Sequence, residues 1–472
     1  MKNPNFLNQL SGLLQRITPT THKLTVTLFT VALGLSVTLY ACQSSAQKEI
    51  TLCFAVPGGN GPGNETPDWE QLTKKFNNDN EGKIKIGLNR SEPEQLKNNY
   101  SSSFKRSEKT KNTDCQVKDI HYDLVYTDII WLPEFAYQNY LLPLDKHFKK
   151  EELEKDFLQT EIEHGQYSPQ EDSSKTKDPK DQPQPQLYRI PFRTDVGVLY
   201  YNKQLLGNEK VPTTFDELLT IAKSKQMKQV DYGYLWQAKE EGLVAMFVEV
   251  LHAYEGFWIK NNEVGLDKDE AMQAVEFLRR TVKDKISPER REFRAEEDAI
   301  KKFREGKSIF LRGWPAASAA FQTKSEVKDR IGIAPMVGEK VGGKGCHGGW
   351  GLAIAKNIDK ERQEAAIKAV KFLTSRQSQL LFTLSHRSVP TRKDLFFDPL
   401  IVDIYSHSHY PELFKMVNKT VSRPRLAKYE KVSKILQNSL SDALSKDDDV
   451  KKIMEKASKR TEECLYENKC SD

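Results

Sequence analysis

The apolar and polar positions of residues 50–88 change period twice, from a strand to a helix and back to a strand. Residues 50–56 are an apolar run that Pro57 and a glycine-rich turn end, which favours a buried strand. A helical pattern follows over 68–78, and residues 83–88 alternate like a half-buried strand. A strand, a helix and a strand at this spacing predict a parallel sheet of the α/β class.

The rest of the chain continues this mixture of strands and helices. Residues 122–128 predict a third strand with Asp128 at its carboxyl end, and strand character returns over 187–201. The remaining predicted elements are a helix start at 213–217, helices at 241–251, 268–283, 296–305, 360–375 and 428–460, and strands at 330–336 and 349–355. Polar residues 98–119 predict a surface insertion, and the Pro-, Gln-, Lys- and Asp-rich residues 168–186 predict a disordered loop.

The N-terminal segment differs from the rest of the chain in charge and in hydropathy. No Asp or Glu precedes Glu49, and the basic residues Lys2, Arg16 and Lys23 precede an uncharged run over 24–40. A basic segment followed by a short apolar one is typical of a secretory signal. Because the run is near the lower length limit for crossing a bilayer, an uncleaved membrane helix is the alternative.

The residues that end this run resemble the lipobox of bacterial lipoproteins. Leu39-Tyr40-Ala41-Cys42 places a small residue before a cysteine, whose sulfur would carry diacylglycerol after cleavage. The likeness implies a lipoprotein signal peptide over 1–41, lipidation at Cys42 and a lipidated tether over 42–48. We therefore expect an exported protein, periplasmic or on the cell surface, that Cys42 anchors to a membrane.

Charge narrows the partners of the mature chain. The 72 Lys and Arg residues against 66 Asp and Glu give the full chain a formal charge of +6. Without Lys2, Arg16 and Lys23 the charge is +3, spread along the chain without a basic stripe. The sequence therefore predicts no nucleic-acid partner. Because no second long apolar segment follows residue 40, we do not expect the mature body to form a pore itself.

The chain has six cysteines, so an odd number remains once Cys42 is set aside. In an exported protein this predicts at least one free thiol. Cys464 and Cys470 close a short loop, for which a disulfide and two exposed thiols on the tail are equally open. Cys53 lies in the apolar first strand and is expected to be a buried small hydrophobic residue.

Several separate motifs follow one another along nearly all of the mature chain. The most specific is Tyr-Arg-Ile-Pro-Phe-Arg-Thr-Asp at 188–195, which runs into Gly-Val-Leu-Tyr-Tyr-Asn-Lys at 197–203. The others are residues 122–131, 141–145, 212–218, 303–307, 313–314, 348–354, 387–391 and 422–424. In this order the motifs resemble the extracellular solute-binding proteins of family 1, especially the trehalose/maltose-type branch.

The resemblance implies a two-lobed α/β fold, the type II periplasmic-binding-protein-like fold, with a hinge that the chain crosses several times. It implies an N-terminal lobe of residues 49–191 plus 349–400 and a C-terminal lobe of 192–348 plus 401–472. It also implies that the lobes close on a sugar, an α-linked disaccharide or a glucosylated compatible solute. The closed form would deliver this ligand to the permease of an ABC importer. We expect a monomer without a cofactor.

A sugar presents hydroxyl groups and flat faces of C–H bonds, so its site needs hydrogen-bond acceptors and aromatic rings. By the resemblance, Asp128 and Asp195 accept hydroxyl hydrogen bonds at strand ends, where open α/β sheets bind ligands. The alternative for each carboxylate is a helix cap or a surface position. Trp314 and Trp350 are the candidate stacking rings, with buried structural tryptophans as the alternative.

The resemblance adds three further contacts. Gly349 would let the backbone approach the ligand, although a plain turn needs glycine equally. Arg423 matches an arginine that points at the ligand in this branch, unless it forms a salt bridge between the lobes. Glu65 lies in the loop after the first strand, which faces the cleft in the family. Three further aromatic residues are expected in the core instead: Trp131, Trp236 and Tyr254.

Other chemical patterns lack the context that they need. Residues 343–348 spell GxGxxG, but a strand rather than a helix follows, so no dinucleotide site is expected. The adjacent Cys346 and His347 lack a third catalytic partner, and His407 and His409 lack further metal ligands. We therefore expect neither a nucleophilic catalytic site nor a metal site.

Two alternatives to sugar binding stay open. Asp128 and Asp195 could act as the acid and nucleophile of a glycoside hydrolase, but neither lies in a glycosidase motif, so we expect no enzyme. The same fold could also bind a non-sugar solute such as a polyamine, because polyamine sites combine aromatic rings with carboxylates.

Overall fold

The computed structural model describes most of residues 49–470. The described residues are 49–58, 64–106, 114–117, 120–168, 184–226, 228–289, 292, 297–322, 325–404, 409–445, 449–467 and 469–470. The predicted signal peptide, Cys42, the tether and most of the predicted loop at 168–186 lie outside these residues. Within the described ranges, no helix combines the length and the apolar character that crossing a membrane requires.

The strand–helix–strand pattern predicted over residues 50–88 forms part of a six-stranded sheet among the described residues. In spatial order its strands are β14 (Val389–Pro390), β6 (Ile190–Val196), β13 (His347–Ile354), β3 (Leu124–Asp128), β1 (Ile50–Pro57) and β2 (Ile84–Ser91). β1 runs parallel to β2 and β3, as predicted. The prediction of a parallel sheet is wrong for the other half, because β13 and β14 enter antiparallel from much later in the chain.

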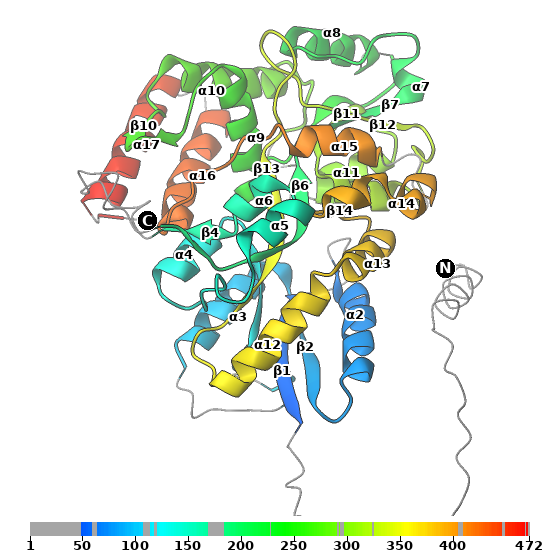
Figure 1. Ribbon diagram of the computed structural model, residues 1–472. Helices are drawn as coiled ribbons and strands as arrows, with labels where there is room; N and C mark the ends of the chain where they lie inside the picture. The colour runs from blue at the N-terminus through cyan, green and yellow to red at the C-terminus, as the bar shows by residue number, and fades with distance from the viewer. Residues whose placement is uncertain are drawn as a thin grey trace, which may run out of the picture. The chain divides into compact units, whose positions relative to one another are not determined.

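Helices α2 (Thr66–Asp79), α3 (Pro93–Phe104) and α12 (Lys360–Leu373) pack around β1 and β2 (Figure 1). α3 corrects the predicted insertion at 98–119, because Leu96, Tyr100 and Phe104 recur every four residues and are buried. The other helices of this part are α4 (Leu132–Tyr137), α5 (Lys150–Asp156), α6 (Gln159–Glu163) and α13 (Arg376–His386).

The predicted role of Cys53 as a simple hydrophobic residue is wrong. Cys53 is buried, as expected, but its sulfur forms a disulfide with Cys115, whose Cα lies 5.3 Å away. On the neighbouring strand, a Cβ at Gly87 would lie 2.6 Å from the Cys115 sulfur. The glycine in β2 therefore leaves the space that this disulfide occupies.

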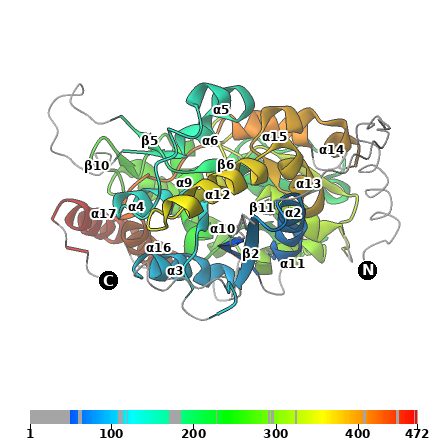
Figure 2. The same ribbon diagram turned by 60° about the horizontal axis from the view of Figure 1, so that its bottom comes forward.

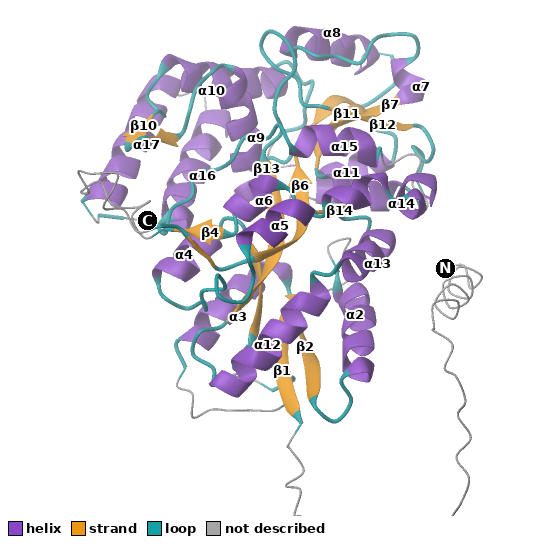
Figure 3. Ribbon diagram, in the orientation of Figure 1, coloured by secondary structure: helices purple, strands orange, loops and turns teal. Residues whose placement is uncertain are grey.

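A second, four-stranded sheet follows the order β12 (Ile331–Ala334), β7 (Val198–Asn202), β11 (Ser308–Gly313) and β8 (Tyr232–Leu235) within the described residues. The chain passes from β6 in the first sheet to β7 in the second at Gly197. A Cβ there would lie 1.8 Å from Oε1 of Glu249, so this crossing requires glycine. Figure 3 shows both sheets as strands surrounded by helices.

The helices around the second sheet come from two stretches that are distant in the chain and pack against each other (Figures 1 and 2). The first stretch holds α7 (Lys203–Leu206), α8 (Phe215–Gln226), α9 (Glu240–Ala253), α10 (Asp269–Lys283), α11 (Glu297–Arg304) and η4 (Pro315–Phe321). The second holds η5 (Lys393–Phe397), α14 (Pro399–Ile404), α15 (Tyr410–Val417), α16 (Tyr429–Ser445) and α17 (Val450–Tyr466). Two short ribbons pair β4 (Gln166–Tyr167) with β5 (Gln186–Leu187) and β9 (Ile259–Lys260) with β10 (Glu263–Val264).

The C-terminal tail corrects one prediction and resolves an open alternative. Residues 428–460 are not one helix, because Asp449 starts a new one by accepting a hydrogen bond from the Lys451 amide at 3.0 Å. Cys464 and Cys470 form a disulfide, and Cys346 is a free, buried thiol as the odd cysteine count predicted.

Buried apolar side chains of the described residues gather in two clusters, one built around each sheet. The cluster of the six-stranded sheet contains Leu52 to Val56 of β1, and that of the four-stranded sheet contains Val198 to Tyr200 of β7. The limits of the two lobes, 49–191 plus 349–400 and 192–348 plus 401–472, stay predictions.

Candidate ligand-binding site

A cavity of about 420 Å³ is lined by residues at strand ends of both sheets and by residues of neighbouring helices. All of the predicted ligand-side residues line it: Glu65, Asp128, Asp195, Trp314, Gly349, Trp350 and Arg423. The structure therefore brings together residues that are up to several hundred positions apart in sequence. Their contacts with a ligand stay predictions.

Strand β13 explains why the two aspartates meet. It lies between β3 and β6, with Trp350 opposite Asp128 on one side and Gly348 opposite Asp195 on the other. A Cβ at Gly348 would lie 3.1 Å from Cβ of Asp195. The glycine therefore lets the Asp195 side chain pass over β13 toward the cavity.

The aspartates differ in their protein partners. Asp128 Oδ1 accepts a hydrogen bond from the Ile130 amide at 3.1 Å, so Asp128 also caps the turn before α4. Asp195 is buried, its Oδ2 accepts from Nη1 of Arg193, and its Oδ1 has no partner among the described residues. Burial raises the pKa of both carboxyl groups, that of Asp195 to about 6, although Arg193 opposes the rise at Asp195.

Glu65 is less available to a ligand than the sequence suggested. Its carboxylate is buried, with Oε2 accepting from the Trp69 indole at 3.1 Å and Oε1 from Nη2 of Arg193 at 3.0 Å. The backbone before α2 thus places Glu65 at the cavity edge, and the two neighbours hold its carboxylate.

Arg193 is a cavity residue that the sequence reasoning did not single out. It donates to Asp195 and Glu65, and its Nε donates to the Tyr126 hydroxyl at 2.8 Å. Its guanidinium also lies 5.3 Å from the ring centre of Trp350. The alternation of β6 could have identified it, because Arg193 and Asp195 are two residues apart and share a face of the strand.

Trp350 stands in a group of aromatic rings at one wall of the cavity. Its ring centre lies 4.8 Å from that of Tyr126 and 5.0 Å from that of Trp131. Trp131 packs against the apolar core, as predicted, but it is only partly buried and also lines the cavity. Trp236 is buried, as predicted.

Trp314 forms part of the opposite wall, directly after β11. The Arg312 guanidinium lies 4.2 Å from its ring centre. Arg312 is itself buried and donates to Glu249 of α9 at 2.6 and 3.0 Å and to Gln237 at 2.7 Å. The Tyr200 hydroxyl donates to the Trp314 carbonyl oxygen at 3.0 Å, which fixes the backbone at the end of the strand.

Gly349 has a neighbour that the sequence did not reveal. A Cβ at this position would lie 2.7 Å from Oε1 of Glu161. The same carboxylate pairs with Arg189 at 2.8 Å and with Nε2 of His347 at 2.9 Å, and Arg189 and His347 lower its pKa to about 2 although burial opposes them. Gly349 therefore makes room for a buried ion pair as well as lining the cavity.

Arg423 enters the cavity from the segment between α15 and α16. Its Nη1 donates to Oε2 of Glu241 at 3.1 Å, and its Nε has no partner within the described part of the chain. Glu241 is held in turn by Tyr429 at 2.6 Å and by Gln437 at 3.0 Å. Arg423 therefore forms an ion pair with Glu241, and its contact with a ligand stays a prediction.

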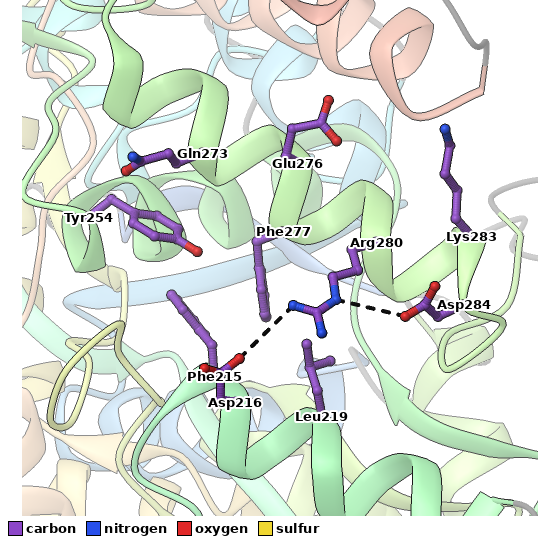
Figure 4. Close-up of a pocket in the computed structure, with 10 residues that line it drawn as sticks. All are labelled: Phe215, Asp216, Leu219, Tyr254, Gln273, Glu276, Phe277, Arg280, Lys283 and Asp284. Atoms are coloured by element: carbon purple, nitrogen blue, oxygen red, sulfur yellow. Dashed lines mark ion pairs between the residues drawn. The ribbon is translucent and has the colours of Figure 1, made fainter.

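A second hollow, of about 450 Å³, lies between α8 and α10. Figure 4 shows Phe215, Phe277 and Tyr254 beside the charged pair of Arg280 with Asp216, at 4.0 Å, and with Asp284, at 3.8 Å. Tyr254 packs against the apolar core, as predicted, but it is only partly buried and also lines this hollow. None of the described residues around it is a predicted ligand contact.

Comparison with known proteins assigns the family. Residues 61–380 match the family described as bacterial extracellular solute-binding protein. The chain belongs to this family. Family membership implies an exported protein, as the N-terminal charge pattern predicted.

Solved structures of solute-binding proteins share the fold. Maltose-bound MalE3 of T. maritima has 27% sequence identity and a TM-score of 0.73, and the match covers 88% of this chain and 98% of that chain. The GacH receptor of Streptomyces glaucescens, solved unliganded and with acarbose, has 18% identity and a TM-score of 0.71 over 89% of this chain and 99% of its own. These likenesses confirm the predicted two-lobed, type II fold.

A curated relative in Deinococcus radiodurans is described as a probable ABC transporter-binding protein. It is 28% identical over 277 residues, which cover 55% of this chain and 64% of the relative. The match therefore spans less than two thirds of that relative's length.

Proposed function

We propose that the chain is the substrate-binding component of an ABC importer and captures a sugar in the cavity described above. The observation that carries this proposal is the Asp195 carboxylate. Its Oδ1 is buried without a partner among the described residues, and Asp195 lines the cavity together with Trp314 and Trp350. A buried acceptor without a partner costs free energy, and a ligand hydroxyl would satisfy it.

The wall composition supports a ligand with both hydroxyl groups and apolar faces. Trp314 and Trp350 can cover C–H faces, while Asp128, Asp195 and Arg423 can bond hydroxyl groups. The volume of about 420 Å³ lies in the range of small-molecule sites. We infer an α-linked disaccharide or a glucosylated compatible solute, in line with the trehalose/maltose-type branch, and closure of the lobes around it.

A thermal-shift screen of the soluble protein, from Gln43 onward, tests this proposal. The probes are maltose, trehalose, sucrose, glucosylglycerol, glucose and spermidine, with calorimetry for each hit. A ligand at a hundred times its dissociation constant stabilises the native state by about 2.7 kcal/mol, so binding raises the melting temperature measurably.

Two outcomes of the screen have opposite meanings. A shift with a disaccharide or glucoside, and recovery of that sugar unchanged, supports the importer role and excludes hydrolysis. A shift with spermidine alone would keep the family and overturn the sugar. Asp195→Ala, with an unchanged melting temperature of the free protein, should abolish the shift.

We further propose that Cys42 carries the lipid that anchors the protein beside its permease. The support is the lipobox-like sequence that ends at this cysteine. Intact-mass analysis of the membrane fraction should show cleavage before Cys42 and added acyl mass. An unmodified N-terminal cysteine, or an uncleaved chain, would contradict the anchor.

A further inference from the structure

Arg193 has more polar and aromatic contacts on the cavity wall than a sugar contact needs. It bonds Asp195, Glu65 and Tyr126, and it lies over Trp350. Its side chain is only 12% exposed, and it lines the cavity. Burial disfavours the charge of Arg193, yet Tyr126, Glu65 and Asp195 together raise its pKa, so it stays cationic.

The charges of the cavity wall show what Arg193 balances. Its acidic residues are Glu65, Glu94, Asp128, Asp195, Glu241 and Glu297, and its arginines are Arg193 and Arg423. Arg423 pairs with Glu241. Among the described residues, Arg193 is the cation that pairs with Glu65, through Nη2, and with Asp195, through Nη1. Without Arg193, two buried carboxylates on one wall would lack a cationic partner.

Without Arg193, the wall would combine tryptophan rings with unpaired carboxylates, and sites of this composition bind ammonium groups. Arg193 already pairs with these two carboxylates and lies over the ring of Trp350. A cationic ligand that approaches them is therefore repelled by the positive charge of the guanidinium. A neutral hydroxyl suffers no such repulsion, and it can donate to Oδ1 of Asp195, which Arg193 leaves open.

We propose that Arg193 is a specificity-determining residue: its ion pairs with Glu65 and Asp195 make the cavity prefer neutral polyols over cationic solutes. This inference rests on the proposed sugar-binding function. It also accounts for the excess of carboxylates on the wall, which would otherwise favour a polyamine.

The test compares matched probes that differ by one charge. Trehalose and 6-amino-6-deoxytrehalose differ by a hydroxyl replaced with an ammonium group, and maltose and spermidine extend the comparison. Their affinities are measured by calorimetry at neutral pH for the wild type, Arg193→Met and Arg193→Lys. Arg280→Met is the matched control, because Arg280 also lies between two carboxylates, Asp216 and Asp284, but outside the cavity (Figure 4).

We expect Arg193→Met to raise the ratio of cationic to neutral affinity by about tenfold or more, since it removes one positive charge a few ångströms from the ligand. Arg193→Lys, which keeps the charge, should stay within about threefold of the wild-type ratio, and Arg280→Met should leave it unchanged. The double variant Glu65→Gln with Arg193→Met removes one of the two freed carboxylates, so its ratio should return toward the wild-type value.

The outcomes separate this inference from the proposed function. If the wild type binds a neutral sugar and Arg193→Met keeps the wild-type ratio, the selectivity role is wrong while sugar binding stands. If the wild type binds only the cationic probes, both are wrong. If Arg193→Met does not fold, Arg193→Gln replaces it, because glutamine can still hydrogen-bond Glu65 or Asp195 but carries no charge, and it should raise the ratio in the same direction.

Discussion

The two walls of the cavity use the same pair of residues, an arginine beside a tryptophan, in different ways. On the six-stranded sheet, Arg193 lies 5.3 Å from the ring centre of Trp350 and lines the cavity itself. On the four-stranded sheet, Arg312 lies 4.2 Å from the ring centre of Trp314 but is fully buried with Glu249.

This difference separates support from recognition. Arg312 pairs with the buried carboxylate of Glu249 and is not among the residues that line the cavity, so it supports Trp314 from behind. Arg193 shares two carboxylates that also face the ligand space, so its charge is part of what a ligand meets. Removal of Arg312 should therefore mainly lower stability, whereas removal of Arg193 should mainly change which ligands bind.

The largest effect is expected on stability, from Arg312→Met. The change leaves Glu249 buried without a cation, which costs about 3–5 kcal/mol of the free energy of unfolding, measured by urea denaturation. Arg193→Met should cost less, since Glu65 and Asp195 border a cavity that water can enter. The double variant Glu249→Met with Arg312→Met should recover much of the loss, and equal losses for the two arginines would contradict the contrast.

The next largest effect is the pH dependence that Asp195, the partner of Arg193, gives to the free energy of unfolding. Burial raises the pKa of Asp195 to about 6, so the folded state binds this proton more tightly than the unfolded chain does. Asp195 therefore contributes stability at about pH 4 that is lost as the pH rises through about 6, by about 3 kcal/mol at about 1.4 kcal/mol per pKa unit.

Urea denaturation of wild type and Asp195→Asn across this range measures the effect. The difference between their free energies of unfolding should change between about pH 4 and pH 6 and stay level above. A difference that is flat across the range, or that changes in the opposite direction, would show that the carboxyl is not held in this way.

The sequence predicted the cavity residues better than it predicted their partners. Asp128, Asp195 and Trp350 stand in motifs at strand ends, and short-range patterns reveal such positions. Ion pairs join distant residues: Arg193 with Glu65 across 128 positions and Arg312 with Glu249 across 63. An arginine in the apolar run Ser-Ile-Phe-Leu-Arg-Gly at 308–313 does signal a buried partner, but not which one.

The same limit explains the errors in the fold. Cys53 finds Cys115 across 62 positions, and the antiparallel entry of β13 depends on how the chain returns from the second sheet. α3 was missed because short polar runs, Lys-Asn-Asn and Ser-Ser-Ser, separate its buried Leu96, Tyr100 and Phe104. Elements with a continuous local period, such as β1 and α10, were predicted to within a few residues.

The smallest expected effect compares the two rings. Trp314→Ala and Trp350→Ala should each weaken the sugar found in the screen by about tenfold, because each removes one aromatic face from the cavity. Trp350→Ala should in addition change the ratio of cationic to neutral affinity, since the ring that Arg193 covers is lost, while Trp314→Ala should leave that ratio unchanged. Calorimetry with trehalose and 6-amino-6-deoxytrehalose decides this point, with Trp236→Phe, a buried ring outside the cavity, as the control. If both variants change the ratio equally, the wall that contains Trp314 also selects ligands by charge. The contrast between Arg312 as a support and Arg193 as a recognition residue would then be wrong.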